Sequence, residues 1–229
     1  MHNTLLKIGK ITERSMKNTV FSTLISLSTA FFASSAFAGD IALGESQANA
    51  CAVCHGENGN SLSPAYPKLA GLGEKYLLKQ LNDIKAGTRN VAMMAGQLDA
   101  KSDAELDALA AYYASQTLQL SGAKELTVRL NSGQEVDALV LGETIYRSGN
   151  HETKVPACSG CHSPSGKGNG PAGYPRLGGQ HADYISAQLK AFRSGVRDND
   201  GDSRTMRSVA KLLSDAEVES LANYIAGLN

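Results

Sequence analysis

The chain has 229 residues, of which 42% are apolar and 19% are charged, so it is long enough for one large domain or two small ones. Its 22 basic residues balance its 22 acidic residues. A balance of this kind gives no indication of nucleic-acid binding, and we expect no nucleic-acid partner.

The N-terminal segment, from Met1 to Ala38, has the layout of a secretory signal peptide. Four basic residues precede an uncharged stretch from Asn18 to Gly39, which contains the sequence Ala36-Phe37-Ala38. Small residues at the first and third of these positions suit a signal peptidase, so we predict cleavage after Ala38 and a periplasmic protein. An uncleaved membrane anchor is the alternative, because the uncharged stretch is long enough to span a bilayer.

Charge is unevenly distributed over the rest of the chain. Loss of the signal peptide removes four basic residues and one acidic residue, which leaves 18 and 21 and a net charge of −3. Residues 39–121 hold six basic and nine acidic residues, whereas residues 122–229 hold twelve of each. A partner that docks by electrostatic steering would therefore distinguish the two halves.

Beyond the signal peptide the chain repeats itself, which indicates two domains of one kind. Two insertions in the second copy, at residues 148–157 and 197–204, are polar or contain glycine, and we expect surface loops there. We assign residues 39–121 to the first domain, 122–135 to a linker and 136–229 to the second domain. The motifs that recur, in the same order, are Leu43-Gly44-Glu45 and Leu141-Gly142-Glu143, Cys51-Ala-Val-Cys54-His55 and Cys158-Ser-Gly-Cys161-His162, and Tyr66-Pro67-Lys68-Leu69 and Tyr174-Pro175-Arg176-Leu177.

The apolar spacing in both copies predicts an all-α fold. Strands are not expected, because no alternating pattern of useful length appears, although Val128 and Leu130 would let part of the linker pack as an extended strap. Apolar residues recur at helical spacing at matching positions, namely Leu77, Leu81 and Ile84 in one copy and Ile185, Leu189 and Phe192 in the other.

A later helix in each copy has a clear start signal. Ser102-Asp-Ala-Glu105 and Ser214-Asp-Ala-Glu217 are capping boxes, in which the serine and the glutamate each satisfy a free backbone N–H. The residues that we expect these two helices to bury are Leu106, Leu109, Ala110 and Tyr113, and Val218, Leu221, Ala222 and Ile225.

Each copy is near the lower size limit at which a single apolar core can stabilise a domain, so a large apolar cofactor in each copy would add stability.

All four cysteines lie in two Cys-x-x-Cys-His motifs. Cysteines three positions apart on a short helix point to one side and can add to the two vinyl groups of a haem, which leaves the next histidine facing the iron. We therefore expect two haem c groups, one attached to Cys51 and Cys54 with His55 as an iron ligand, and one attached to Cys158 and Cys161 with His162.

Three other roles for the cysteines explain less of the pattern. Disulfides are the usual interpretation of an even cysteine count in an exported protein, but they give the histidines no role. A thioredoxin-like redox site lacks its βαβ context. A zinc site built from all four cysteines would link the two copies and leave both histidines unused.

The sixth iron ligand has a candidate in each copy. A methionine or histidine there favours electron transfer, whereas an open position permits ligand chemistry. Met94 and Met206 each lie eight residues before a capping serine, and no other pair of methionines is related in this way. Met93 corresponds to Thr205 in the second copy, so we expect Met93 to be a packing or surface residue.

A ligating histidine usually donates its second ring N–H to a backbone carbonyl. Pro67 follows His55 and Pro175 follows His162 at nearly the same separation along the chain, so both prolines are candidates for that position. Simple turn formation is the other interpretation of the two prolines. His181 has no counterpart in the first copy, and we expect it at the surface.

These motifs resemble cytochrome c4, a family of dihaem bacterial cytochromes, over nearly the whole chain after the signal peptide. The resemblance implies two cytochrome c domains related by a pseudo-twofold axis, with haem propionates near the domain interface, the same two His–Met pairs and prolines that fix the histidines. The segments that carry it are Cys-x-x-Cys-His followed by Gly-x-x-Gly-Asn, Tyr-Pro-Lys-Leu-Ala-Gly, Tyr76-Leu-Leu-Lys-Gln-Leu81 and Tyr-Pro-Arg-Leu-Gly-Gly-Gln-His181.

The resemblance also implies a function in electron transfer, from a cytochrome bc-type donor towards a terminal oxidase. We expect a monomeric carrier and not an enzyme, and the sequence is compatible with loose membrane association. A dihaem peroxidase would need an iron with an accessible site, whereas this chain offers a methionine to each haem. The cytochrome subunit of a dehydrogenase complex stays open as an alternative, because partner contacts leave no motif.

Overall fold

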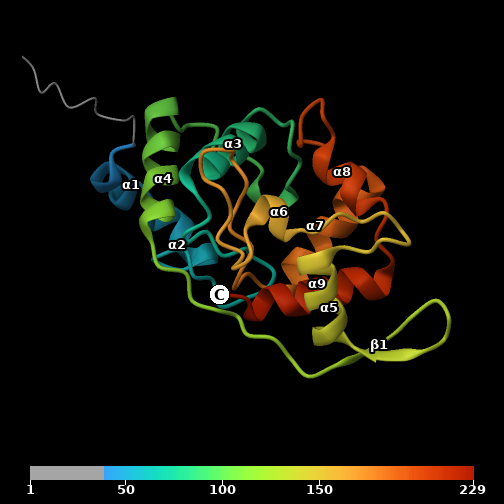
Figure 1. Ribbon diagram of the computed structural model, residues 1–229. Helices are drawn as coiled ribbons and strands as arrows, with labels where there is room; N and C mark the ends of the chain where they lie inside the picture. Colours follow the sequence, from blue (N-terminus) through green and yellow to red (C-terminus); the bar gives the residue numbers. More distant parts are fainter. Residues whose placement is uncertain (1–38) are drawn as a thin grey trace, which may run out of the picture. The chain divides into compact units, whose positions relative to one another are not determined.

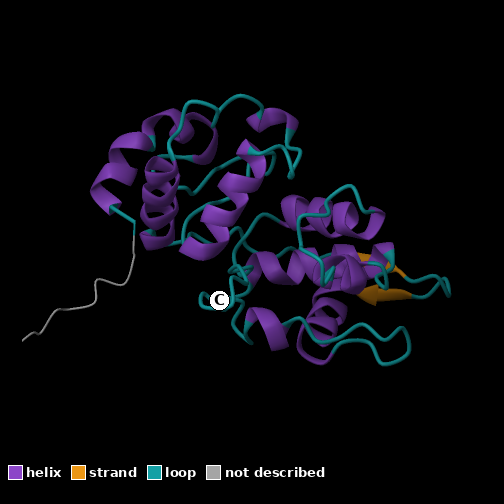
Figure 2. Ribbon diagram, turned by 90° about the horizontal axis from the view of Figure 1, so that it is seen from above, coloured by secondary structure: helices purple, strands orange, loops and turns teal. Residues whose placement is uncertain are grey.

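A computed structural model describes residues 39–229 (Figure 1), and the predicted signal peptide lies outside the described residues. The described part is mainly helical, with one short hairpin (Figure 2), and none of its helices is long and apolar enough to cross a membrane. The first half contains α1 (Ile41–Gln47), α2 (Asn49–His55), α3 (Glu74–Lys85), the 3₁₀ helix η1 (Ala92–Met94) and α4 (Asp103–Ser115). The second half contains α5 (Ala138–Ser148), α6 (Ser159–His162), α7 (Ala182–Ser194), α8 (Thr205–Ala210) and α9 (Asp215–Gly227).

Both predicted capping boxes are confirmed. The backbone N–H of Glu105 donates to the Ser102 hydroxyl at 3.3 Å, and the Glu105 carboxylate accepts from the Ser102 N–H at 2.8 Å. Ser214 and Glu217 form the same pair of bonds, at 3.3 and 2.7 Å, at the start of α9. The apolar residues predicted to be buried along α4 and α9 are at most 3% exposed.

A glycine in each half allows two helices to cross at close range. Helix α1 packs against α4, and α5 packs against α9. A Cβ atom on Gly44 would lie 2.1 Å from the carbonyl oxygen of Ala108, and one on Gly142 would lie 2.2 Å from that of Ser220. The repeated Leu-Gly-Glu motif is therefore explained by close backbone contact, which only glycine permits.

The segment predicted as a linker, residues 122–135, is more ordered than a simple connection. Strands β1 (Thr127–Arg129) and β2 (Glu135–Asp137) pair in an antiparallel hairpin, with Val128 opposite Val136. Val128 is 4% exposed and packs with Ala138 and Ala216 of the second half. The expectation that Val128 packs is confirmed, but three-residue strands are too short for the alternation on which strand prediction rests.

Side-chain contacts join the two halves. The backbone N–H of Lys68 donates to Gln180 Oε1 at 2.9 Å, and Gln180 Nε2 donates back to the Lys68 carbonyl at 2.8 Å. His181, expected at the surface, instead lies between the halves, with Nε2 3.0 Å from the carbonyl oxygen of Ser61 and Nδ1 3.0 Å from the Ser121 hydroxyl. The expectation was wrong because it rested on the lack of a counterpart in the repeat, and a contact between the copies needs no counterpart.

The Gly142→Ala variant tests the helix crossing in the second half. Alanine favours a helix over glycine by about 0.5–1 kcal/mol, but here its methyl group would overlap a backbone oxygen that is held by α9. We expect the variant to lower the free energy of unfolding by about 1–3 kcal/mol, measured by denaturant titration. Gly170→Ala is the matched control, because no atom lies within 4 Å of its added Cβ. Equal midpoints for wild type and Gly142→Ala would contradict the account.

Candidate functional site

The two Cys-x-x-Cys-His motifs occupy equivalent helices. Helix α2 ends at His55 and α6 ends at His162, and each histidine is 7% exposed. The next residue takes a positive φ in both halves, 79° at Gly56 and 67° at Ser163, so the chain turns away directly after the histidine. The structure thus places the predicted cysteines and histidines of each half at the same point of the fold.

Each histidine is held by a backbone carbonyl. His55 Nδ1 donates to the carbonyl oxygen of Pro67, and His162 Nδ1 donates to that of Pro175, both at 2.9 Å. Burial lowers the pKa of both imidazoles, and the hydrogen bond to the proline carbonyl only partly opposes this shift. At neutral pH each ring is therefore neutral, with the proton on Nδ1 and the lone pair of Nε2 free to bind a metal.

A cavity of about 1330 Å³ lies beside His55. Its size, its apolar wall and the two thiols at its edge fit a haem, which can be attached through vinyl groups and bound through Nε2 of the histidine. The buried hydroxyl of Tyr113 on its wall has no hydrogen-bond partner within residues 39–229. The residues on its wall that form this apolar setting include Leu69, Leu72, Leu77, Leu81, Ile84, Leu98 and Leu109.

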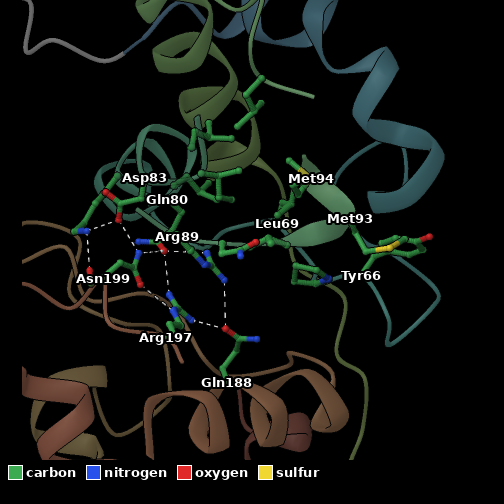
Figure 3. A pocket seen from close by; sticks show the side chains of 18 of the residues that line it. Tyr66, Leu69, Gln80, Asp83, Arg89, Met93, Met94, Gln188, Arg197 and Asn199 are labelled. Atoms are coloured by element: carbon green, nitrogen blue, oxygen red, sulfur yellow. Dashed lines mark hydrogen bonds and ion pairs between the residues drawn. The ribbon is translucent and has the colours of Figure 1, made fainter. Parts of the chain in front are cut away.

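Met93 and Met94 both reach the cavity from η1 (Figure 3). The side chains of these neighbouring residues point in different directions, and Met93 is 67% exposed whereas Met94 is half-buried. Met206 is also half-buried and lies in the first turn of α8. Both candidate methionines therefore lie on short helices.

The surroundings of the cysteines argue against the alternative roles. Burial raises the pKa of Cys51, and it raises the pKa of Cys158 to about 11, whereas redox-active cysteines have a lowered pKa. Within residues 39–229, no group of three or more histidine, cysteine, aspartate or glutamate side chains could hold a metal ion. The four cysteines therefore do not meet in a zinc site, and no disulfide joins any two of them.

Sequence reasoning missed two tyrosines that fix the segments after the motifs. The Tyr112 hydroxyl donates to the carbonyl oxygen of Glu57 at 3.1 Å, and the Tyr146 hydroxyl donates to that of Ser163 at 2.7 Å. The two tyrosines come from different helices, α4 and α5, so the repeat could not reveal their common role.

Sequence reasoning also missed a set of polar residues between the halves. Gln80 and Arg89 in the first half have counterparts in Gln188 and Arg197, at the same offset along the chain as the two copies of the Tyr-Pro motif. That shared offset is the signal that could have identified them. Arg197 lies in the insertion that we expected to be a surface loop, but it contacts the first half.

Tyr146→Phe tests whether this hydroxyl supports the segment after His162. Tyr146 is fully buried, and loss of its hydroxyl would leave the Ser163 carbonyl without this donor. We expect a fall of about 1–3 kcal/mol in the free energy of unfolding, measured by denaturant titration of the haem-loaded protein. Tyr174→Phe is the control, because that ring also lies near His162 but is 37% exposed. An unfolding curve identical to wild type would show that the bond gives no support.

Comparison with known proteins gives one consistent result. The family model for cytochrome c matches residues 41–117 and 140–229, which are the two halves that carry the motifs. Cytochrome c4 of Azotobacter vinelandii is 50% identical over 201 residues, which cover 84% of this chain and 90% of that protein. A thiosulfate dehydrogenase electron acceptor of Stutzerimonas stutzeri is 38% identical over 182 residues, covering 79% of this chain and 80% of that protein.

A solved structure shows the same arrangement. The crystal structure of reduced recombinant cytochrome c4 from Pseudomonas stutzeri matches with a TM-score of 0.77 and 45% identity, and the match covers 84% of this chain and all of that chain. The predicted all-α fold of two cytochrome c domains is therefore confirmed, as are the two haem c groups. This chain belongs to the cytochrome c4 family, dihaem electron carriers with a cytochrome c domain in each half.

Proposed function

We propose that this chain is a periplasmic carrier that accepts electrons from a cytochrome bc-type donor and passes them towards a terminal oxidase. The observation that carries the proposal is the buried, neutral histidine of each half, which is held by a proline carbonyl and ends a Cys-x-x-Cys-His motif. Export by a signal peptide of residues 1–38 is part of the proposal, as is a monomer with domains at residues 39–121 and 136–229 joined by residues 122–135.

The proposal assigns each haem a set of protein groups. A haem supplies an iron that is oxidised and reduced by one electron. The reduction potential of the haem depends on the axial ligands of the iron and on the surroundings. Pro67 and Pro175 keep the two imidazoles in the orientation and tautomer that ligation needs. The groups that would hold the haems are Cys51, Cys54, His55 and Met94 in the first half, and Cys158, Cys161, His162 and Met206 in the second.

The same residues explain why electron transfer suits the site better than catalysis. A protein ligand on each side of the iron leaves no position for a substrate, and a methionine on one side favours a relatively high potential. Apolar side chains form a large part of the cavity wall beside His55. A dihaem peroxidase would need acid–base groups beside an accessible iron, whereas each half of this chain offers a methionine at that position.

Met94 is the better candidate than Met93 for two independent reasons. It has a counterpart in Met206 at the same distance from the capping serine, whereas Met93 corresponds to Thr205. It is also half-buried on the cavity wall, and 67% of Met93 is exposed to solvent. The half-buried side chain of Met94 is therefore better placed for an iron–sulfur bond inside the cavity than the exposed side chain of Met93.

Replacing the methionines one at a time tests the ligand assignment. We expect Met94→Ala and Met206→Ala each to remove the far-red methionine–iron charge-transfer band from one haem and to lower the potential of that haem, because a methionine ligand raises it. The measurements are absorption spectra of the oxidised protein and a potentiometric titration. Met93→Ala is the matched control and should retain both bands. An unchanged titration for Met94→Ala, or loss of a band in Met93→Ala, would overturn the choice of Met94.

A second candidate function is that of electron acceptor for a thiosulfate dehydrogenase. The similarity to a thiosulfate dehydrogenase electron acceptor favours it, although the similarity to cytochrome c4 is higher. Three apolar side chains of the first half, Val53, Leu62 and Met93, are 89%, 96% and 67% exposed, so each is available for contact with a partner of either kind. The counterpart of Val53 in the second half is Gly160.

Reduction kinetics with purified partners separate the two candidates. We expect rapid reduction of the oxidised protein by a cytochrome bc complex, slowed in Val53→Gly, which gives the first half the glycine of the second. The measurement is stopped-flow absorbance at low and high salt, because steering by the acidic first half weakens as salt is added. Faster reduction by a thiosulfate dehydrogenase with its substrate than by the bc complex would favour the second candidate.

A further inference from the structure

The second copy of the repeat carries extra residues directly before its candidate methionine ligand. Arg89 and Met94 are five positions apart in the first half, whereas the equivalent Arg197 and Met206 are nine positions apart in the second. The four extra residues lie in the loop between α7 and α8. The loop that leads to the methionine is therefore longer in the second half than at the same point of the first.

Asp200 lies in this loop and holds the beginning of α8. One oxygen of its carboxylate accepts from the backbone N–H of Arg207 at 2.9 Å, and the other accepts from Arg207 Nε at 2.6 Å. The side chain of Asp200 is only 6% exposed, and that of Arg207 is 24% exposed. Burial of a carboxylate is costly unless a partner compensates for the lost water, so this pair fixes the two residues relative to each other.

The first turn of α8 depends on this contact from outside the helix. Its cap residue, Arg204, has no side-chain hydrogen bond to the helix, and a φ of 49° places it in the left-handed region. Such a conformation is unfavourable for a residue other than glycine and persists where surrounding contacts fix the chain. Asp200 supplies the acceptor that the cap residue lacks, at the residue that directly follows Met206.

Asn199 anchors the same loop to the first half of the chain (Figure 3). Its side-chain nitrogen donates to Gln80 Oε1 at 2.9 Å and to Asp83 Oδ2 at 2.6 Å. Its backbone carbonyl accepts from Lys79 Nζ at 2.8 Å. All three partners lie on α3, a helix of twelve residues, so the position next to Asp200 is tied to a long element of the other half.

The methionine of the first half has no comparable support. The backbone N–H of Met94 donates to the carbonyl oxygen of Val91, and within residues 39–229 no side chain accepts from a backbone N–H of η1. A short turn that is held by local backbone bonds opens more easily than a segment tied to a packed helix. The two halves therefore differ in how firmly the chain beside the candidate ligand is held.

We propose that Asp200 is a positioning residue for Met206, that Asn199 ties it to the first half, and that the second haem consequently keeps its methionine more firmly than the first. The inference rests on the proposed function, in which Met94 and Met206 bind iron. Asp200 acts through Arg207, the neighbour of Met206, and does not touch the iron itself.

The test measures how fast imidazole displaces the methionines from the oxidised, haem-loaded protein. Imidazole is the side-chain ligand of histidine and takes the sixth position when a methionine leaves, so loss of the far-red methionine–iron band reports the opening of each site. We expect two phases in the wild type. The slower phase should be the one that remains in Met94→Ala, in which the second haem alone retains a methionine.

Asp200→Asn should accelerate the slower phase by about fivefold to fiftyfold, because it removes a hydrogen-bonded charge. The faster phase should not change. Hydrogen exchange of the α8 amides should also become faster in this variant. Asp202→Asn is the matched control, since Asp202 loses the same charge from the same loop but is exposed and forms no ion pair within residues 39–229. Asp200→Glu, which keeps the charge, replaces Asp200→Asn if that variant fails to mature, and it should show a smaller acceleration.

Asn199→Ala tests the anchor to the first half. We expect it to accelerate the slower phase by about twofold to tenfold, because the ion pair of Asp200 remains while its neighbour loses the bonds to α3. Asp198→Ala is the control, because Asp198 is exposed and directly precedes Asn199.

Each result has a distinct consequence. An Asp200→Asn rate equal to wild type would overturn the role of Asp200, and an Asn199→Ala rate equal to wild type would overturn the anchor. Equal acceleration of both phases, or the same acceleration in Asp202→Asn, would also contradict the inference. Retention of both bands in Met206→Ala would instead overturn the ligand assignment, so failure of the proposed function is distinguishable from failure of this inference.

Discussion

One hydrogen bond in each half fixes the orientation of the histidine on which haem binding depends. His55 and His162 each donate from Nδ1 to a proline carbonyl 2.9 Å away, which fixes the ring and leaves Nε2 free. The surrounding elements support each histidine in this position. Crossing helices at Gly44 and Gly142 form the frame, and tyrosine hydroxyls hold the segment that follows each histidine. The result in each half is a neutral imidazole inside a largely apolar domain.

Much of this could be predicted from the sequence, because local signals carry it. The capping boxes fixed the starts of α4 and α9, since a serine and a glutamate three residues apart satisfy backbone groups with no help from the rest of the fold. The cysteine motifs specified the chemistry because each residue in them has its own function. Comparison of the two copies favoured Met94 over Met93, and the exposure of Met93 supports that choice.

Contacts between the copies could not be predicted in this way. A repeat shows which residues are equivalent but not which residues touch. His181 was therefore wrongly expected at the surface, and the contact of Arg197 with the first half was not foreseen. Their partners Ser61 and Gln80 lie more than a hundred positions away along the chain. The hairpin at Val128 was missed for a different reason, because strands of three residues give almost no periodicity. The structure therefore adds most to the sequence analysis at the junction between the two similar domains.

The central claim is that each half holds a haem c through its own cysteine pair. Mass spectrometry of the peptides released from the mature protein by protease digestion tests this claim most directly. The account predicts one covalent haem on the peptide with Cys51 and Cys54, and another on the peptide with Cys158 and Cys161, with no cysteine left to react with an alkylating reagent. A peptide from either half with two alkylated cysteines, or with a disulfide between them, would contradict it.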